Sequence, residues 1–197
     1  MNLPDPEMAW AFARHNLREV PAFGINHAKR VLNNADEISK AMPKGLPVDK
    51  DVLQTAAILH NVGAKQSLSY AQDIRQTSLS LAKKFLGRGG YTKEQTEKIL
   101  VAIKEQPYGG SPETAEAKVL HDAILLEYSG ALGFIKDIYV LGLTKTPLPL
   151  AIKKIRSNRE VLGQGFQTKK GRELGEERVK AYRKLSLELE NELASPK

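Results

Sequence analysis

The chain has 197 residues, of which 41% are hydrophobic and 27% charged, a balance typical of a soluble globular protein that buries a core without covalent staples. It contains no cysteine, which excludes disulfides, thiolate nucleophiles and zinc–thiolate sites, so any metal ion must be held by imidazole and oxygen ligands. The formal charge of +7 favours acidic partners such as nucleotides, phosphate esters or nucleic acid.

Two kinds of partner are disfavoured by the sequence. Only 6% of the residues are aromatic, and no basic run is interleaved with aromatic residues, so nucleic acid is not the expected partner. No apolar run approaches the roughly 20 residues that cross a bilayer, and residues 1–7 lack the features of a signal peptide. We therefore expect a cytoplasmic protein without a membrane partner.

Hydrophobic residues recur at helical spacing along the chain, and neither an alternating strand pattern nor an internal repeat is present, so the chain is predicted to be all-α. Asn26 is the predicted cap of the second helix, and Thr92 with Gln95 forms a predicted capping box. Pro147 and Pro149 mark a loop that a basic segment follows. The predicted helices cover residues 7–20, 27–42, 49–61, 70–86, 93–105, 112–128, 131–142 and 168–193.

The third predicted helix carries an imidazole on its buried face. Leu53, Ala56 and His60 share one side of this helix, just before Gly63 stops it. A buried histidine is either satisfied by hydrogen bonds or binds a metal ion, and the sequence leaves both readings open.

Two further residues of ligand type accompany His60. His27 lies one turn before Val31 on the inner stripe of its helix. Asp122 is embedded in an apolar run, where an unpaired carboxylate is costly, so it needs a cation or strong donors. Histidine and oxygen side chains from three helices are the minimum for a hard or borderline divalent cation, so the three residues are candidates to converge on one.

Three segments resemble motifs of the HD-domain metal-dependent phosphohydrolase superfamily, which carries a His-Asp dipeptide. They are Asn-His-Ala-Lys-Arg-Val at 26–31, Ala-Ile-Leu-His-Asn-Val-Gly at 57–63 and Ala-Lys-Val-Leu-His-Asp-Ala at 117–123.

The resemblance covers nearly the whole chain. Residues 109–116 and 168–193 are similar to the small single-domain bacterial branch of the superfamily. The resemblance implies one HD-domain-like helical bundle over residues 1–197, with a core at about 7–142 and a C-terminal helical extension at about 150–193.

The resemblance implies hydrolysis of a nucleotide or phosphate ester, because the family's metal activates a water and neutralises phosphoryl oxygens. Carried over to this sequence, it implies that His27, His60 and Asp122 are metal ligands and that Asn61 is a weak fourth. One divalent ion (Mn, Fe, Ni, Zn or Mg) is then the expected cofactor, and His60, Asn61 and Asp122 are the expected catalytic residues.

Three basic residues lie in or near the matching segments. Lys65, just past the His-Asn turn, and Arg30, one turn after His27, are candidates to face phosphate. Solvent exposure of Lys65 and a structural ion pair of Arg30 are equally open interpretations. Arg178 is expected to form a structural ion pair.

The sequence departs from the family pattern at the expected site. Asn61 replaces the aspartate of the dipeptide, and a neutral amide weakens one metal site and disfavours a second. Asp122-Ala123-Ile124-Leu125 stands where many relatives read Asp-Ala-Asp-Arg, so a second acid and an arginine are missing. Gln106 replaces a usual histidine, and Gly24 replaces an acidic residue that is often found three positions before the first histidine.

Two functions therefore stay open. The first is a weak or altered metal-dependent phosphohydrolase that acts on a nucleotide or phosphate ester. The second is a catalytically inactive HD-fold protein that binds a nucleotide or regulatory ligand in the same pocket. A structural or nucleic-acid-binding helical protein rests on net charge alone and ranks third.

Overall fold

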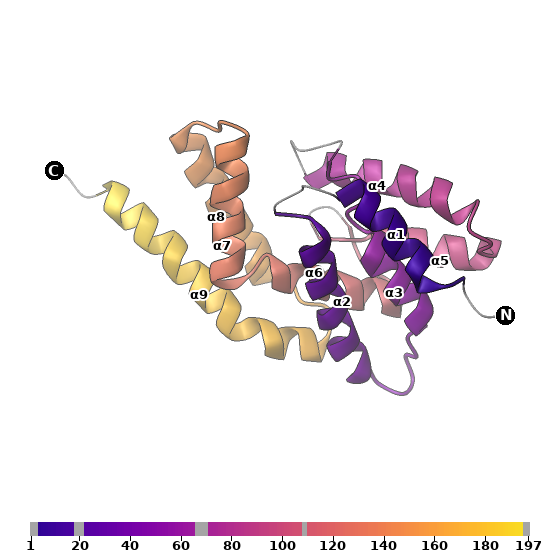
Figure 1. Ribbon diagram of the computed structural model, residues 1–197. Helices are drawn as coiled ribbons and strands as arrows, with labels where there is room; N and C mark the ends of the chain where they lie inside the picture. Colours follow the sequence, from indigo (N-terminus) through magenta and orange to yellow (C-terminus); the bar gives the residue numbers. More distant parts are fainter. Residues whose placement is uncertain (1–3, 18–21, 66–70, 108–109, 195–197) are drawn as a thin grey trace.

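Figure 1 shows the computed structural model of the protein, which describes residues 4–17, 22–65, 71–107 and 110–194. The described residues form nine α-helices and no β-strand, so the all-α prediction is confirmed. Within these ranges no helix is both long enough and apolar enough to cross a membrane. The helices are α1 (Pro6–Leu17), α2 (Ile25–Lys40), α3 (Lys50–Leu59), α4 (Ala71–Leu86), α5 (Lys93–Lys104), α6 (Ala115–Glu127), α7 (Gly130–Leu143), α8 (Leu148–Gln164) and α9 (Lys169–Ala194).

Capping residues set several helix ends as the sequence predicted. The Asp49 carboxylate accepts two backbone N–H bonds at the start of α3, and the capping box of Thr92 begins α5. The second helix differs, because Gly24 is its N-cap residue and the helix already includes Asn26. The predicted cap at Asn26 is therefore wrong.

The helix α8 was not predicted from the apolar spacing, which indicated a loop and a basic segment, although the family resemblance implied a helical extension from about residue 150. Pro147 and Pro149 occupy the cap and the first turn, where a missing N–H costs the helix nothing. Ala151, Ile155 and Leu162 recur at helical spacing and are buried in a cluster with α9. Basic side chains lie between these three positions, so the apolar spacing was not recognised in the sequence.

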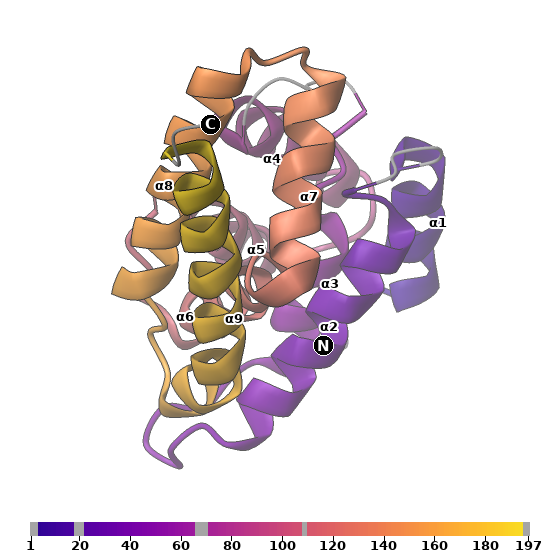
Figure 2. The ribbon, with the colours of Figure 1, turned by 90° about the vertical axis from the view of Figure 1, so that its left-hand side faces the viewer.

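The core consists of two hydrophobic clusters. One lies among α1 to α6, and the other lies among α6 to α9. Figures 1 and 2 show α7, α8 and α9 together on one side of the molecule and α1, α4 and α5 on the other. Because α6 takes part in both clusters and is buried almost throughout, its charged side chains must find partners inside the protein.

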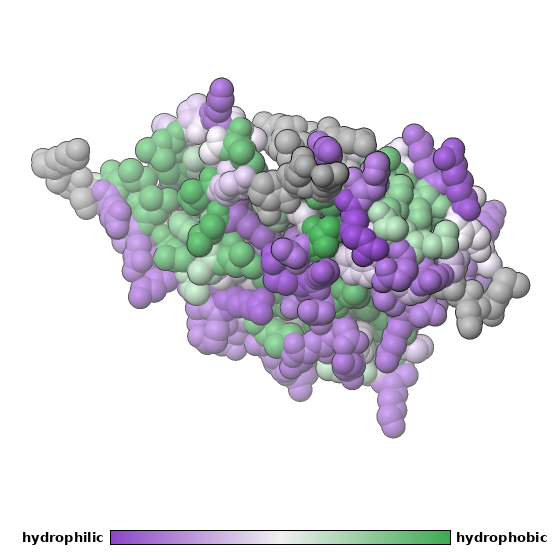
Figure 3. All heavy atoms as spheres, in the orientation of Figure 1, coloured by the Kyte–Doolittle hydropathy of each residue, from purple (hydrophilic) through white to green (hydrophobic). Residues whose placement is uncertain are grey.

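One side of α7 is apolar and exposed, while the other side packs on α9. The ring of Phe134 lies 5.6 Å from that of Tyr182 in α9, centroid to centroid. Apolar side chains gather over α7 and α8 in Figure 3. The exposed apolar residues of α7 are Leu132, Ile135, Ile138, Tyr139 and Leu143.

Candidate functional site

His27 and His60 meet inside the protein. His27 lies in the first turn of α2, and His60 follows the last residue of α3 as its C-cap. Their Nε2 atoms are 3.1 Å apart, and both side chains are buried. The structure therefore brings together two of the four ligands that the sequence predicted.

Hydrogen bonds at the other ring nitrogens determine how the two imidazoles face each other. His60 Nδ1 lies 2.7 Å from the carbonyl oxygen of Ala57, so it carries a proton and donates. His27 Nδ1 lies 3.1 Å from the carboxylate of Glu127 and donates in the same way. In neutral rings both Nε2 atoms then present lone pairs to each other, an arrangement that a shared proton or another cation would relieve.

Burial keeps both rings neutral at neutral pH. Desolvation lowers the pKa of His27 from 6.5 to about 4, although the hydrogen bond to Glu127 opposes this shift. Desolvation and the neighbouring His27 lower the pKa of His60 to about 3. Desolvation thus outweighs the gain from a proton shared between the two Nε2 atoms.

These two shifts predict that the protein loses stability in weak acid. Each histidine binds a proton in the unfolded chain below pH 6.5 but not in the folded protein, so stability falls as pH drops below that value. Between pH 7 and pH 5.5 the expected loss is roughly 1 kcal/mol for each histidine. Urea unfolding at the two pH values measures it. His60→Asn should remove about half of the loss.

Glu127 and Lys136 complete the cluster, although the sequence analysis did not identify them. Both are buried, at 2% and 5% exposure. Lys136 Nζ lies 2.9 Å from Glu127 Oε2 and 3.2 Å from His27 Nδ1. Arg30 contacts the same carboxylate with Nε at 3.0 Å and Nη2 at 2.9 Å. The sequence did offer a signal for both residues: each is a charged residue in an apolar helix, and a buried charge needs a buried partner.

The surroundings of Glu127 keep it ionised. Burial raises its pKa, but the hydrogen bonds from His27 and Arg30 and the charge of Lys136 outweigh this effect and hold the pKa well below its ordinary value. Burial lowers the pKa of Lys136, while Glu127 opposes that shift. The result is a buried carboxylate that orients His27 and is itself held by two cationic side chains.

Asp122 faces α9 and not the histidine pair. Its Oδ1 accepts the backbone N–H of Gln167, and its Oδ2 accepts both the N–H and the hydroxyl of Thr168, each at 2.7 Å. Gly171 packs so closely that a Cβ there would lie 2.2 Å from Oδ2. Both carboxylate oxygens therefore cap the start of α9, and the predicted ligand set is not brought together.

Helix geometry places Ile124 on the face of α6 that carries Glu127, the residue that contacts His27. Glu127, which contacts His27, lies three residues after Ile124 and shares its face, whereas Asp122 lies about 200° away around the helix. Ile124 is buried, and it stands at the position where the family resemblance implies a second acid. Across the described ranges no group of three histidine, aspartate or glutamate side chains is placed to hold a metal ion. These residues do not fit a metal centre with three such ligands.

Asn61 follows His60 and is 4% exposed, and its Nδ2 has no hydrogen-bond partner among the described residues. Gln106 donates to the carbonyl oxygen of His60 at 3.0 Å. Lys65 is exposed to solvent. An unpaired buried NH₂ group costs free energy unless an acceptor from outside the protein reaches it, so Asn61 is suited to an oxygen-rich ligand.

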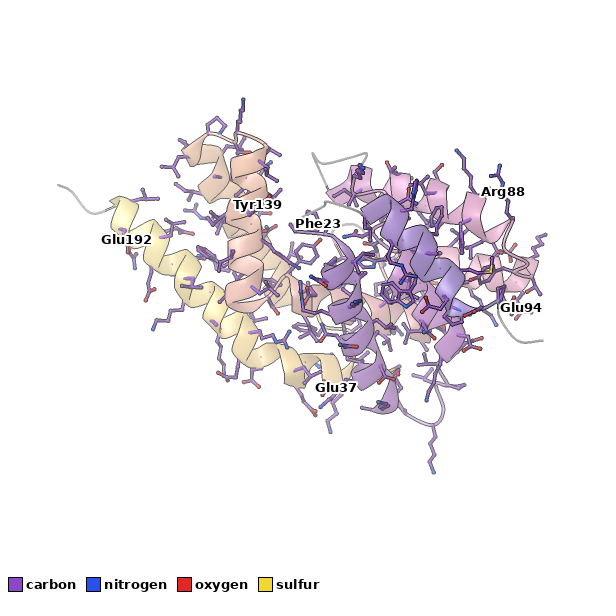
Figure 4. All side chains as sticks on the ribbon, viewed as in Figure 1. Phe23, Glu37, Arg88, Glu94, Tyr139 and Glu192 are labelled. Carbon is purple, nitrogen blue, oxygen red and sulfur yellow. The ribbon has the colours of Figure 1, made fainter. Side chains whose placement is uncertain are left out.

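Aromatic rings border the histidine pair. The ring centroid of His27 lies 6.0 Å from that of Phe23 and 6.2 Å from that of Tyr128. Figure 4 shows Phe23 beside the start of α2, on the side that faces α7. Burial raises the pKa of Tyr128, which remains a neutral phenol. These rings lower the local dielectric and strengthen the polar contacts around the pair.

Several solved structures share this fold, and two of them are named as HD-superfamily hydrolases. The structure of Bacillus subtilis YpgQ in complex with ADP is 22% identical, with a TM-score of 0.68 over 95% of this chain and 98% of that chain. A predicted HD superfamily hydrolase from an uncultured Thermotogales bacterium is 22% identical, with a TM-score of 0.60 over 95% and 92%. An HD-superfamily hydrolase from Bacillus thuringiensis is 20% identical, with a TM-score of 0.63 over 97% of each chain.

The chain therefore has the HD-domain fold, as its motifs predicted. No protein-family model matches the sequence, and no curated protein matches it either. At these identities the likeness concerns the fold alone, so the function must be argued from the site.

Proposed function

We propose that this protein uses its HD fold to bind a nucleotide or another phosphate ester beside His27 and His60, without a complete hydrolytic metal centre. The observation that carries the proposal is the apolar Ile124 on the histidine side of α6, while the carboxylate of Asp122 is used by α9. A catalytic metal needs about three protein ligands, and the second acid is replaced at the position where it would face the pair.

The charges around the pair support an anionic ligand. Lys136 and Arg30 face one carboxylate, that of Glu127, while the histidines are neutral. With aspartate at position 61 and no metal, a phosphate group would be repelled. The NH₂ of Asn61 instead has no partner in the described part of the chain, so it can donate to a phosphate oxygen. The same replacement thus weakens cation binding and favours anion binding.

ADP is the first ligand to test, since the YpgQ structure contains it. Saturating ADP is expected to raise the melting temperature by several degrees, because a ligand at 100 times its Kd adds about 2.7 kcal/mol. Differential scanning fluorimetry should show the same rise with EDTA present. The rise should fall sharply in Asn61→Ala and stay unchanged in Asn16→Ala, because the Asn16 amide donates to the carbonyl oxygen of Phe12 in its own helix.

A weak metal-dependent phosphohydrolase is the second candidate, favoured by the two Nε2 lone pairs that converge at 3.1 Å. It predicts that phosphate is released from ADP only when a divalent metal is added and that His60→Ala abolishes the release. That result, or a thermal shift that chelator removes, would replace the binding proposal with the enzymatic one.

A further inference from the structure

A cavity of about 370 Å³ lies where α2, α9 and the start of α7 meet, and we call it the arginine cavity. Its volume falls in the range of small-molecule sites. None of His27, His60 and Asn61 lines it, although Glu127, which contacts His27, and its partner Arg30 do. Its lining residues are Arg30, Asn33, Asn34, Leu126, Glu127, Ser129, Gly130, Ala131, Leu132 and Arg178.

Two guanidinium groups from different helices line the cavity. Arg178 of α9 donates from Nη1 to the carbonyl oxygen of Leu126 at 3.3 Å. The structural ion pair that the sequence predicted for it is not found within the described parts of the chain. Arg30 of α2 binds Glu127 through Nε and Nη2, and its side chain stays 42% exposed. Both groups therefore keep N–H donors for a further acceptor.

The start of α7 adds backbone donors to the same cavity. Ser129 is the N-cap residue, but its hydroxyl donates to the carbonyl oxygen of Leu126 and makes no cap bond to α7. The N–H groups of the first turn, which belong to lining residues, thus have no side-chain cap. Gly130 has φ +69°, and a Cβ there would lie 3.5 Å from Cβ of Arg178, so α9 lies close against this end of α7.

Glu127 is the one acidic residue that lines the cavity, and its charge is already compensated. Arg30 and Lys136 both form ion pairs with it, and His27 donates to it. Arg178 therefore contributes a positive charge that no carboxylate of the described residues offsets. The balance in the cavity favours an anion.

We propose that the arginine cavity binds a phosphate group, either inorganic phosphate or the phosphate of a monoester. The guanidinium groups of Arg30 and Arg178 and the first-turn N–H groups of α7 act as its donors. This site does not depend on the ligand of the histidine pair.

Isothermal titration of the full-length protein with inorganic phosphate at low ionic strength tests the proposal. The unmodified protein should bind phosphate saturably, and added sodium chloride should weaken the binding. Arg178→Met should weaken it about tenfold or more, since it removes a charge-assisted donor. Arg178→Lys should retain part of the affinity. Arg183→Met, on the same helix but outside the lining, should bind like the unmodified protein.

Equal affinity of the unmodified protein and a folded Arg178→Met variant would overturn the proposal, as would the absence of saturable binding. Loss of phosphate binding in Asn61→Ala but not in Arg178→Met would place the phosphate at the histidine pair, so the cavity proposal would fail while the proposed function stands. Conversely, ADP stabilisation that survives Arg178→Met, together with lost phosphate binding, would support both sites.

Discussion

Replacing Asn61 and Ile124 together by aspartate is expected to create a protein that binds about one equivalent of a divalent metal ion, whereas the unmodified protein binds none tightly. His27 and His60 already present converging lone pairs, and the two new carboxylates would supply the missing oxygen ligands. The cation would also relieve the repulsion between the two Nε2 atoms.

Elemental analysis of protein purified without chelator measures the metal, and melting with and without manganese reports whether it binds the folded state. Ile124→Asn combined with Asn61→Asp is the matched control, because it adds a polar side chain of similar size without the charge. Asp122→Asn in the aspartate double variant should leave the metal content unchanged. Metal in the unmodified protein, or metal that depends on Asp122, would contradict the assignment of Ile124.

Most of the helices could be predicted from the sequence because their apolar residues recur at helical spacing. The spacing of apolar residues and the capping box at Thr92 set α5 to within a residue, since both signals act locally. The end of α6 was placed equally well, but its start was predicted at Pro112, whereas the cap is Thr114. For α8, closely spaced basic residues hid a narrow apolar stripe, so its burial against α9 was the deciding fact.

The sequence predicted that His27 and His60 belong to one site, but it did not predict which residues of α6 face them. This helix is buried on nearly all sides, so periodicity does not indicate which neighbour each residue faces. Asp122 needed a strong donor or cation, as the sequence indicated, but the donors are backbone groups at the start of α9. Only tertiary packing reveals that Ile124 and Glu127 share the histidine side.

Lys136 was missed for a related reason. It lies in an apolar helix that the sequence predicted, and its long side chain could have reached solvent from an exposed face. In the fold Lys136 is buried and its Nζ contacts the carboxylate of Glu127, although Glu127 lies in the preceding helix. The charged partners of His27 thus come from residues that no motif marks.

The second large effect concerns Asp122, whose replacement by alanine is expected to destabilise the protein by about 4 kcal/mol. The change removes the acceptor for the N–H groups of Gln167 and Thr168 and for the Thr168 hydroxyl, all of which lie at the start of α9. Because Asp122 and Thr168 are buried, water cannot replace the carboxylate as it does at an exposed cap.

Urea unfolding with EDTA present measures this loss without any contribution from a metal ion. Asp49→Ala is the matched control, since Asp49 caps α3 with two backbone bonds but is exposed, and it should cost only about 1 kcal/mol. A loss in Asp122→Ala no larger than that of the control would remove the structural role assigned here. Asp122 would then again be free to serve as the metal ligand that its motif implies.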